Sequence, residues 1–318
     1  MTSPCAVITG IGHALPPTVV TNDDLAARLD TTDEWIRTRS GIRQRFIAPP
    51  GMGTGDLAVE AGAQALKSAG VDTVDLVIVA TSTPDRPCPA TAPAVMTRLG
   101  LGRVPAFDMN AVCSGFLYGL ATSVGMLSTG HFGSVLLIAA DTFSRLIDND
   151  DRATAFLFGD GAGAVVLRRG EPDEHGAVLG VDIASDGAGE ELIIVPDRDA
   201  HFTMQGQAVY RQAVAAMSDA ALRMIPAVGW SVDDVDWIVG HQANQRILDA
   251  VANRMGVAPA RSISNVARVG NTAAASIPLA LSDAAAEGRL NPGDRVVLTA
   301  YGGGATWGAA ALTWPSLS

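Results

Sequence analysis

Residues Ala58 to Thr83 read AVEAGAQALKSAGVDTVDLVIVATST, an alanine-rich run that leads into a short β-branched run. The first part has the composition and length of a helix, and the second part, DLVIVAT, has those of a buried strand. Other β-branched runs are SVLLIAAD, GAVVL, DWIVG and RVVLTAY, and alanine-rich segments separate several of them. Strands that alternate with helices predict an α/β fold with largely buried sheets.

The same order of helix and strand recurs later in the chain. Residues Ala213 to Asn244 read AVAAMSDAALRMIPAVGWSVDDVDWIVGHQAN, again with Val-Asp just before the strand. A further helix and strand follow in both segments, GFLYGLATSVGML with VLLIAAD and AAASIPLALSDAAAEG with VVLTAYG. The chain is therefore interpreted as a duplicated α/β unit with Cys113 and Asn271 at corresponding turns. We place the two halves at residues 1–170 and 171–318.

Composition limits the classes of protein to be considered. The chain has 318 residues, of which 48% are hydrophobic, so it can bury a large core. Its three cysteines do not suggest a disulfide framework, no apolar run reaches about 18 residues, and the N-terminal stretch has no basic flank. We expect a soluble, cytoplasmic protein. The net charge of −11 disfavours nucleic acid and anionic membranes as partners, although RTRSGIRQR (Arg37 to Arg45) is a local basic patch.

Neither glycine-rich loop has the pattern of a nucleotide site. TGIGHALPP lacks a third glycine and continues into two prolines, which block the helix that would hold a pyrophosphate. FGDGAGAVVL leads into a strand instead of a helix. The five histidines do not form a metal-ligand cluster in the sequence. We therefore expect no cofactor and no metal.

Three residues at element junctions could carry nucleophilic chemistry. Cys113 lies where the strand-like PAFDMNA meets the helix-like GFLYGLATSVGML, and a helix N-terminus stabilises a thiolate. The alternative is a small buried hydrophobe. His241 follows DWIV, and Asn271 in VGNTAAASIP precedes a helix that it could simply cap. Together the three residues indicate a nucleophile with two hydrogen-bonding groups, and AYGGGATWG adds glycines whose N–H groups can approach a reacting oxygen.

Six stretches that span nearly the whole chain follow one another in a recognisable order: DTTDEWIRTRSGIRQRFIA, PAFDMNAVCSGFLYGL, FGDGAGAVVL, GHQANQRI, GNTAAASIP and YGGGATWGAAAL. In sequence and order they resemble the β-ketoacyl-acyl carrier protein synthase III family of the thiolase superfamily. This resemblance implies a thiolase-like five-layered αβαβα fold of two duplicated halves with mixed sheets, usually in a homodimer.

The resemblance also implies a reaction. An acyl-coenzyme A (acyl-CoA) primer would acylate Cys113, and malonyl-acyl carrier protein would then condense with the acyl group and lose carbon dioxide. His241 and Asn271 would stabilise the enolate, and the backbone N–H groups of Cys113 and Gly303 would form the oxyanion hole. The product would be a β-ketoacyl thioester that starts a fatty acid or a polyketide.

The family's binding residues can be carried over to this chain in the same way. Trp35 would stack on adenine and the arginines would pair with phosphates. The residues implied for coenzyme A are Thr31, Trp35, Arg39, Arg152 and Asn244. Arg211 and Arg246 would dock the acidic carrier protein.

Some differences from the family leave alternatives open. Cys88 stands where many members have a bulky aromatic residue that closes the acyl pocket, so we expect room for a longer or branched primer. A related enzyme could instead pass the acyl group to a hydroxyl, an amine or an unusual extender in specialised metabolism. A papain-like peptidase also uses Cys, His and Asn, but the CGSCW motif and the disulfides of that class are absent from the sequence. A non-catalytic partner subunit would be expected to lack Cys113.

Overall fold

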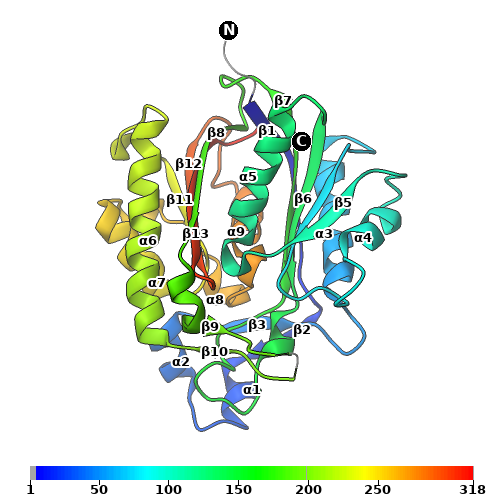
Figure 1. The fold of residues 1–318 in the computed structure, drawn as a ribbon. Coiled ribbons are helices and arrows are strands. Elements are labelled where there is room, and N and C mark those ends of the chain that lie inside the picture. The colour runs from blue at the N-terminus through cyan, green and yellow to red at the C-terminus, as the bar shows by residue number, and fades with distance from the viewer. Residues whose placement is uncertain (1–4, 198, 318) are drawn as a thin grey trace.

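The computed structural model describes residues 5–197 and 199–317, and nine of the strands in this part of the chain form one mixed sheet. In Figure 1 the sheet divides into two layers that face each other. The first layer contains, in spatial order, β1 (Cys5–Ala14), β7 (Gly161–Gly170), β6 (Ser134–Asp141), β4 (Val77–Ala80) and β5 (Ala106–Met109). The second contains β8 (Ala177–Ser185), β13 (Thr306–Thr313), β12 (Arg295–Gly302) and β11 (Trp237–Gly240).

The two layers have the same connectivity. In each, the first strand in sequence lies beside the last, and the remaining strands follow in the same order. A single parallel bridge between Ile238 and Ser262 takes the place of β5 in the second layer. The expected duplication is therefore present in the fold. Since β7 ends at Gly170 and β8 begins at Ala177, the connection between the two layers is short. The division of the chain into two domains at residue 170 stays a prediction.

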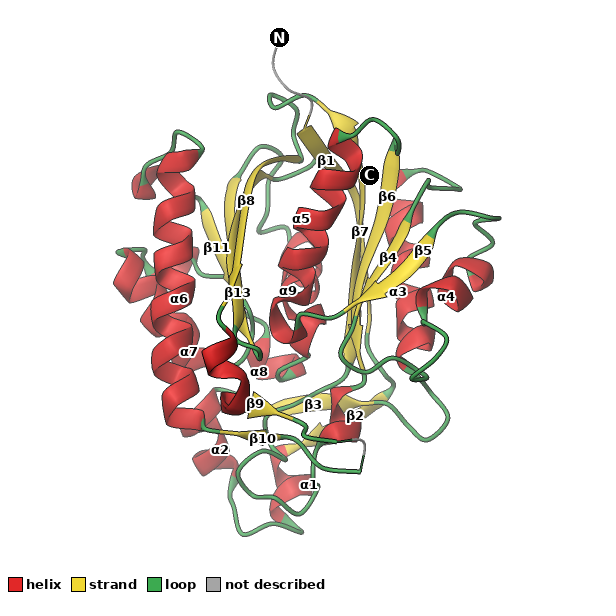
Figure 2. Ribbon diagram, in the orientation of Figure 1, coloured by secondary structure: helices red, strands yellow, loops and turns green. Residues whose placement is uncertain are grey.

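Helices form three further layers, two outside the sheet layers and one between them, so the fold has five layers (Figure 2). The first sheet layer is covered on its outer face by α3 (Thr54–Ala69) and α4 (Ala92–Arg98), and the second by α6 (Gly206–Ala227) and α7 (Gln245–Met255). Between the sheet layers lie α5 (Gly115–Ser128) and α9 (Ser276–Ala286). The αβαβα arrangement is thus confirmed. None of the described helices is long and apolar enough to cross a lipid bilayer.

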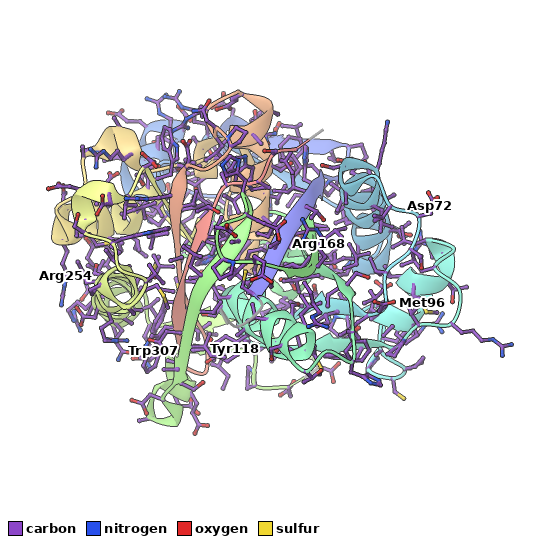
Figure 3. All side chains as sticks on the ribbon, turned by 90° about the horizontal axis from the view of Figure 1, so that it is seen from above. Asp72, Met96, Tyr118, Arg168, Arg254 and Trp307 are labelled. Carbon is purple, nitrogen blue, oxygen red and sulfur yellow. The ribbon has the colours of Figure 1, made fainter. Side chains whose placement is uncertain are left out.

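The view along the layers shows their order from one side of the molecule to the other (Figure 3). Arg254 on α7 and Asp72 after α3 lie at opposite ends, and Tyr118 on α5 and Trp307 on β13 lie between them. The Tyr118 hydroxyl donates to the carbonyl oxygen of Ala184 on β8 at 2.7 Å. Since α5 also packs against β6, and α9 packs against β7 and β11, both central helices contact both sheet layers.

Small residues let the central helices approach the strands and each other. A Cβ atom on Gly119 of α5 would lie 2.4 Å from Leu137 Cδ1 of β6, and one on Gly115 would lie 3.0 Å from Ala274 Cβ. All four residues of β4 are buried, as expected for a strand covered on both faces. The close packing brings the N-terminal ends of α5 and α9 together, and this meeting point determines where the site lies.

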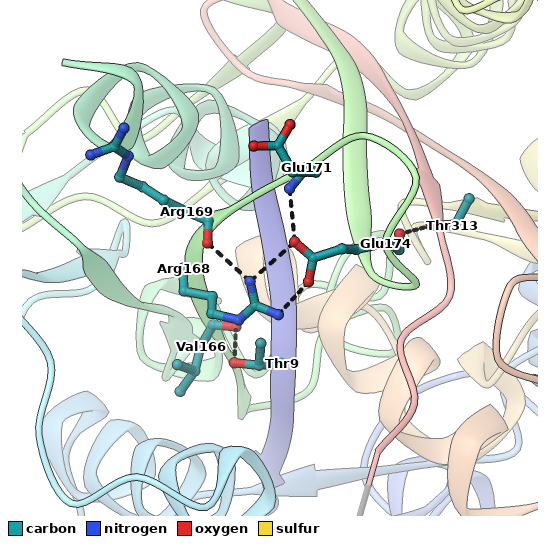
Figure 4. A network of polar contacts seen from close by, with 7 residues as sticks. All are labelled: Thr9, Val166, Arg168, Arg169, Glu171, Glu174 and Thr313. Atoms are coloured by element: carbon teal, nitrogen blue, oxygen red, sulfur yellow. Dashed lines mark hydrogen bonds and ion pairs between the residues drawn. The ribbon is translucent and has the colours of Figure 1, made fainter. Parts of the chain in front are cut away.

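The connection from β7 to β8 is held by a polar network at the surface (Figure 4). Arg168 forms an ion pair with Glu174 at 2.5 Å, and the Glu174 carboxylate also accepts from the backbone N–H of Glu171 at 2.8 Å. The Thr313 hydroxyl donates to the Glu174 carbonyl oxygen at 3.1 Å. Because the ion pair is solvent-exposed, it contributes at most about 1 kcal/mol, and its main effect is to order the turn.

Short elements close one end of the layers, below the strand ends in Figure 1. Phe143, Phe158 and Phe202 pack there with ring centroids 4.5–5.5 Å apart. The elements are β2 (Thr18–Thr21), α1 (Asn22–Ala26), α2 (Asp33–Ser40), β3 (Gln44–Ile47), β9 (Ile193–Ile194), β10 (Thr203–Met204) and α8 (Val266–Val269).

Candidate active site

Cys113 lies in a strained turn between β5 and α5. It is the middle residue of the short 3₁₀ helix η1 (Val112–Ser114), and it is only 7% exposed. The preceding residue, Val112, has φ of 48°, a left-handed conformation that is unfavourable for a β-branched side chain. The Asn110 side-chain oxygen accepts from the Val112 N–H at 3.0 Å and holds this turn. The predicted strand-to-helix junction at the cysteine is confirmed.

The second half of the chain repeats this turn. Asn271 Oδ1 accepts from the Ala273 N–H at 2.9 Å, and Ala273 has φ of 47°. The 3₁₀ helix η6 (Ala273–Ala275) then leads into α9. Cys113 and Asn271 do lie on corresponding turns, but the residue that matches Cys113 is Ala274, and Asn271 matches Asn110.

His241 immediately follows β11 and is fixed on two sides. Its backbone N–H donates to the Thr299 carbonyl oxygen at 2.8 Å, and its Nδ1 lies 2.6 Å from the Ser276 hydroxyl oxygen. The side chain is 3% exposed, and this burial lowers the pKa of the imidazole to about 3. The ring is therefore neutral at physiological pH.

The structure brings Cys113, His241 and Asn271 to one pocket of about 40 Å³. Since Asn271 Oδ1 is bonded to the Ala273 N–H, its amide nitrogen is left without a partner among the described residues and can donate to a ligand. The remaining lining is mainly apolar: Val112, Phe143, Phe158, Ile193, Phe202, Met204, Val209, Ala213, Met217, Ala243, Ile247 and Tyr301. The pocket thus combines a thiol with two polar side chains inside a mainly apolar lining.

Burial opposes the thiolate that the helix position predicts at Cys113. Burial raises the pKa of the Cys113 thiol, and the nearby Asp141 carboxylate raises it further. The sulfur lies in a short turn ahead of α5 and away from solvent. Burial and the Asp141 charge therefore favour the protonated thiol.

Asp141 is an element of the site that the sequence did not reveal. It ends β6, is fully buried, and accepts from the Thr81 and Thr83 hydroxyls at 3.1 and 2.9 Å and from the Ser82 N–H at 2.8 Å. Its second oxygen accepts from the Ala274 N–H at 3.1 Å. Burial raises the pKa of this carboxyl to about 6. The only signal in the sequence was an acidic residue at the end of the apolar run SVLLIAAD.

The glycine run after β12 lies against the backbone of Cys113. A Cβ atom on Gly302 would be 2.8 Å from the Cys113 nitrogen and 2.9 Å from the Ser114 nitrogen. Gly303, the expected second oxyanion donor, follows directly, and its carbonyl oxygen accepts from the Thr306 hydroxyl at 3.1 Å. Because position 302 has no side chain, its backbone can lie against the Cys113 nitrogen.

A wider cavity of about 490 Å³ adjoins the inner pocket and shares Asn271 and several apolar residues with it. Four residues with expected binding roles line the wider cavity: Arg39, Asn244, Arg211 and Arg246. Asn244 also caps α7, because its oxygen accepts from the Arg246 N–H at 2.8 Å and its amide donates to the Arg39 carbonyl at 3.0 Å. The arginines give this wider cavity, which we call the entrance, a positive charge in an otherwise acidic protein.

Trp35 and Arg152 lie beside this entrance. The Arg152 guanidinium is 4.9 Å from the centre of the Trp35 ring, and that of Arg39 is 5.7 Å from it. The Trp35 ring meets Phe156, which lines the cavity, edge to face. Thr31 does not line the cavity, but its hydroxyl is buried and has no described partner. The predicted coenzyme A residues thus gather at one rim, with Thr31 set apart.

Cys88 is exposed and lines neither the inner pocket nor the wider cavity. Its expected role in the acyl pocket stays a prediction. A different cavity, of about 570 Å³, lies behind the inner pocket. The two share Val112, Phe143, Ile193 and Phe202, which form the wall between them.

Comparisons with known proteins agree with this geometry. Family models for "3-Oxoacyl-[acyl-carrier-protein (ACP)] synthase III" and for its C-terminal part match residues 107–187 and 225–314. The chain is 56% identical over 328 aligned positions to "Beta-ketoacyl-[acyl-carrier-protein] synthase III 3" of Streptomyces coelicolor, with 98% of each chain covered.

Solved structures are similar over the whole chain. The 3-oxoacyl-(acyl carrier protein) synthase III of Pseudomonas aeruginosa PAO1 matches with a TM-score of 0.96 and 50% identity, covering 99% of both chains. The priming β-ketosynthase from the R1128 polyketide biosynthetic pathway matches with a TM-score of 0.93 and 32% identity, covering 98% of this chain and 97% of the other. The protein is a thiolase-fold enzyme. Within that class, the chain belongs to the β-ketoacyl-acyl carrier protein synthase III family.

Proposed function

We propose that this enzyme is an acyltransferase that condenses an acyl group from acyl-CoA with malonyl-acyl carrier protein, releases carbon dioxide and forms a β-ketoacyl thioester. The main supporting observation is that Cys113, His241 and Asn271 share one pocket at the inner end of a cavity lined by arginines. The names of the relatives and of the polyketide priming enzyme agree with this reaction. The reaction needs no cofactor or metal, because acyl-CoA is itself the substrate.

In the first half-reaction Cys113 Sγ attacks the thioester carbonyl. A new bond forms between Sγ and the acyl carbon, the bond from that carbon to the coenzyme A sulfur breaks, and the thiol proton ends on the leaving sulfur. The backbone N–H groups of Cys113 and Gly303 would bind the oxyanion of the tetrahedral intermediate. Because burial raises the pKa of the Cys113 thiol, we expect its deprotonation to accompany the attack.

In the second half-reaction the malonyl group loses its carboxylate as carbon dioxide, and the electron pair forms an enolate. Hydrogen bonds from His241 and from the Asn271 amide would stabilise the enolate oxygen. The enolate carbon attacks the acyl group, the bond to Cys113 Sγ breaks, and the thiolate takes a proton from solvent. Neutral donors suit this step, because they stabilise the negative charge without protonating the nucleophilic carbon.

The entrance would bind both substrates. Trp35 would stack on the adenine of acyl-CoA, while Arg39 and Arg152 would pair with its phosphates; Thr31 and Asn244 would contribute nearby. Arg211 and Arg246 at the same cavity would attract an acidic carrier protein.

We expect Arg211→Glu to raise KM for malonyl-acyl carrier protein about tenfold, which corresponds to a loss of about 1.4 kcal/mol of binding free energy. Arg223→Glu on the same helix, where Arg223 already pairs with Asp182 at 3.5 Å, is the control.

We further propose a cytoplasmic homodimer. The outer edge of β5 pairs with no described strand, so a second copy could extend the sheet there. Free thiols at all three cysteines suit a reducing compartment. In such a dimer Cys88 of one subunit would face the acyl pocket of the other, next to the cavity behind Val112 and Ile193.

The size of the acyl group can be tested with a series of primers. If Cys88 leaves room in the pocket, branched or longer acyl-CoA thioesters should acylate Cys113 at least as fast as acetyl-CoA does. Cys88→Phe should then restore a preference for acetyl-CoA. A strict preference for acetyl-CoA in the unchanged enzyme would contradict the proposed role of Cys88.

Intact-mass analysis tests the proposed reaction directly. After incubation with acyl-CoA thioesters, the protein should gain one acyl group, which malonyl-acyl carrier protein discharges with release of carbon dioxide. Cys113→Ala should abolish the adduct, while Cys5→Ala, a change on the distant strand β1, should retain it. Discharge only by an alcohol or amine would identify a transferase to those acceptors, and no adduct with any thioester would refute both reactions.

A further inference from the structure

The Ser276 hydroxyl is the hydrogen-bonding partner of His241 Nδ1, at 2.6 Å. Ser276 is fully buried and is the first residue of α9, so its position depends on how that helix begins. The start of α9 is itself fixed, because the Ala274 N–H donates to the buried Asp141 carboxylate at 3.1 Å. The serine therefore presents its hydroxyl to the imidazole from a rigid position.

The surroundings of Ser276 determine the direction of this hydrogen bond. Among the described residues, the hydroxyl has no polar partner other than His241 Nδ1. If Nδ1 carried the proton, the Ser276 hydroxyl hydrogen would be buried without an acceptor, which folded proteins avoid. If the hydroxyl donates to an unprotonated Nδ1, both groups are satisfied. The neutral ring then carries its single proton on Nε2.

We propose that Ser276 is a positioning residue that donates to Nδ1 of His241 and thereby keeps the imidazole proton on Nε2, directed at the Cys113 pocket. The consequence for catalysis rests on the proposed function. In the condensation, the Nε2–H would donate to the enolate oxygen beside the Asn271 amide. No proton is transferred in this step, because the histidine keeps its proton throughout.

This arrangement makes His241 a hydrogen-bond donor and a poor base. Burial lowers the pKa of its ring to about 3 and raises the pKa of the Cys113 thiol, so transfer of the thiol proton to the ring is unfavourable. With Nε2 already protonated, the ring also presents no lone pair to the thiol. Acylation of Cys113 should therefore depend much less on Ser276 than the decarboxylation and condensation do.

Nuclear magnetic resonance of the unchanged protein tests the proton position without any turnover. With ¹⁵N-labelled histidine, the His241 signals are assigned by their absence in His241→Gln. We expect a protonated Nε2 and an unprotonated Nδ1 across neutral pH. A proton found on Nδ1 would overturn the proposal, even if the enzyme condenses its substrates normally.

Ser276→Ala tests the consequence in the two half-reactions. We expect condensation to slow about tenfold, while acylation measured by mass changes less than about twofold. Ser276→Thr, which retains the hydroxyl, should recover most of the rate. Ser282→Ala is a matched control on the same helix, because Ser282 bonds Nδ1 of a different histidine, His13, at 2.8 Å.

The outcomes separate the two proposals. Equal losses in acylation and condensation would show that Ser276 has only a structural role. If instead the unchanged enzyme forms the acyl adduct but never decarboxylates malonyl-acyl carrier protein, the proposed function fails, while the proton position on His241 can still be read from the spectrum. A Ser276 variant that does not fold leaves the spectrum of the unchanged protein as the decisive measurement.

Discussion

Asp141 and Gly302 occupy the same position in the two halves of the molecule. Each is the last residue of an eight-residue strand, β6 and β12, and these strands have the same place in their sheet layers. Asp141 accepts from the N–H of Ala274, whereas the Cβ that Gly302 lacks would lie 2.8 Å from the nitrogen of Cys113. One half thus places a carboxylate against its helix start, and the other places only a glycine backbone there.

Gly302→Ala should therefore slow the acylation of Cys113, because the added methyl group crowds the backbone of the turn that holds Cys113. The added methyl group would press on the N–H that is expected to bind the oxyanion, and loss of one such donor costs about 10²–10³ in rate. The rate of acyl-adduct formation, followed by intact mass, measures the effect. Gly125→Ala in α5 is the control, since no atom lies within 4 Å of its added methyl group. An unchanged rate in Gly302→Ala would contradict the placement of the oxyanion hole.

Asp141→Asn should make Cys113 more reactive and the fold less stable. Removing the buried charge lowers the pKa of the thiol, so alkylation of Cys113 by iodoacetamide at neutral pH should accelerate. An amide can replace only some of the carboxylate's acceptor bonds, and we expect unfolding in urea to require about 2 kcal/mol less. Asp236→Asn is the control, because the Asp236 carboxylate accepts from the Arg295 N–H at the surface. Slower alkylation in Asp141→Asn would show that the carboxylate does not act on the thiol electrostatically.

Trp35→Ala should weaken binding of the nucleotide part of acyl-CoA. Loss of one stacking face costs about 1–3 kcal/mol, so KM for acyl-CoA should rise about tenfold or more. Acyl-pantetheine, which has no adenine, should be used as well as before. Trp230→Ala is the control, because it removes a different tryptophan, whose ring centre lies 5.5 Å from the Arg295 guanidinium. It should not change KM for acyl-CoA or for acyl-pantetheine. Equal losses with both substrates would place adenine elsewhere.

His241 should affect stability below neutral pH. Its pKa of about 3 lies below that of an unfolded histidine, so the unfolded chain binds a proton first as the pH falls, and the folded state loses stability. Between about pH 7.5 and about pH 5 this loss amounts to about 2 kcal/mol.

The pKa of Asp141 is raised, so this carboxyl contributes in the opposite direction as the pH falls. That contribution is present in both the unchanged protein and His241→Gln. The difference between their free energies of unfolding therefore isolates the effect of His241. We expect that difference to shrink by about 2 kcal/mol over the same range, measured by urea unfolding. Parallel stability curves would mean that His241 titrates normally.

Much of the architecture could be predicted because its signals are local. Alternating alanine-rich and β-branched runs indicated the helices and strands, and the repeated order indicated two similar halves. The turn around Cys113 was also recognisable, because small residues precede a helix-like run. His241 and Asn271 followed from short motifs. Asp141, Ser276 and Gly302 were not singled out, because each acts on a residue that is distant in the sequence.

The sequence by itself determined the succession of elements, the duplicated order and the choice of Cys113, His241 and Asn271 as candidate site residues. Only the tertiary structure decided the protonation of these groups. Burial raises the pKa of the Cys113 thiol and lowers that of His241, and Asp141 adds its charge from a different strand. Desolvation and charge proximity depend on which segments pack together in space, and the helix position that suggested a thiolate carried no information about either.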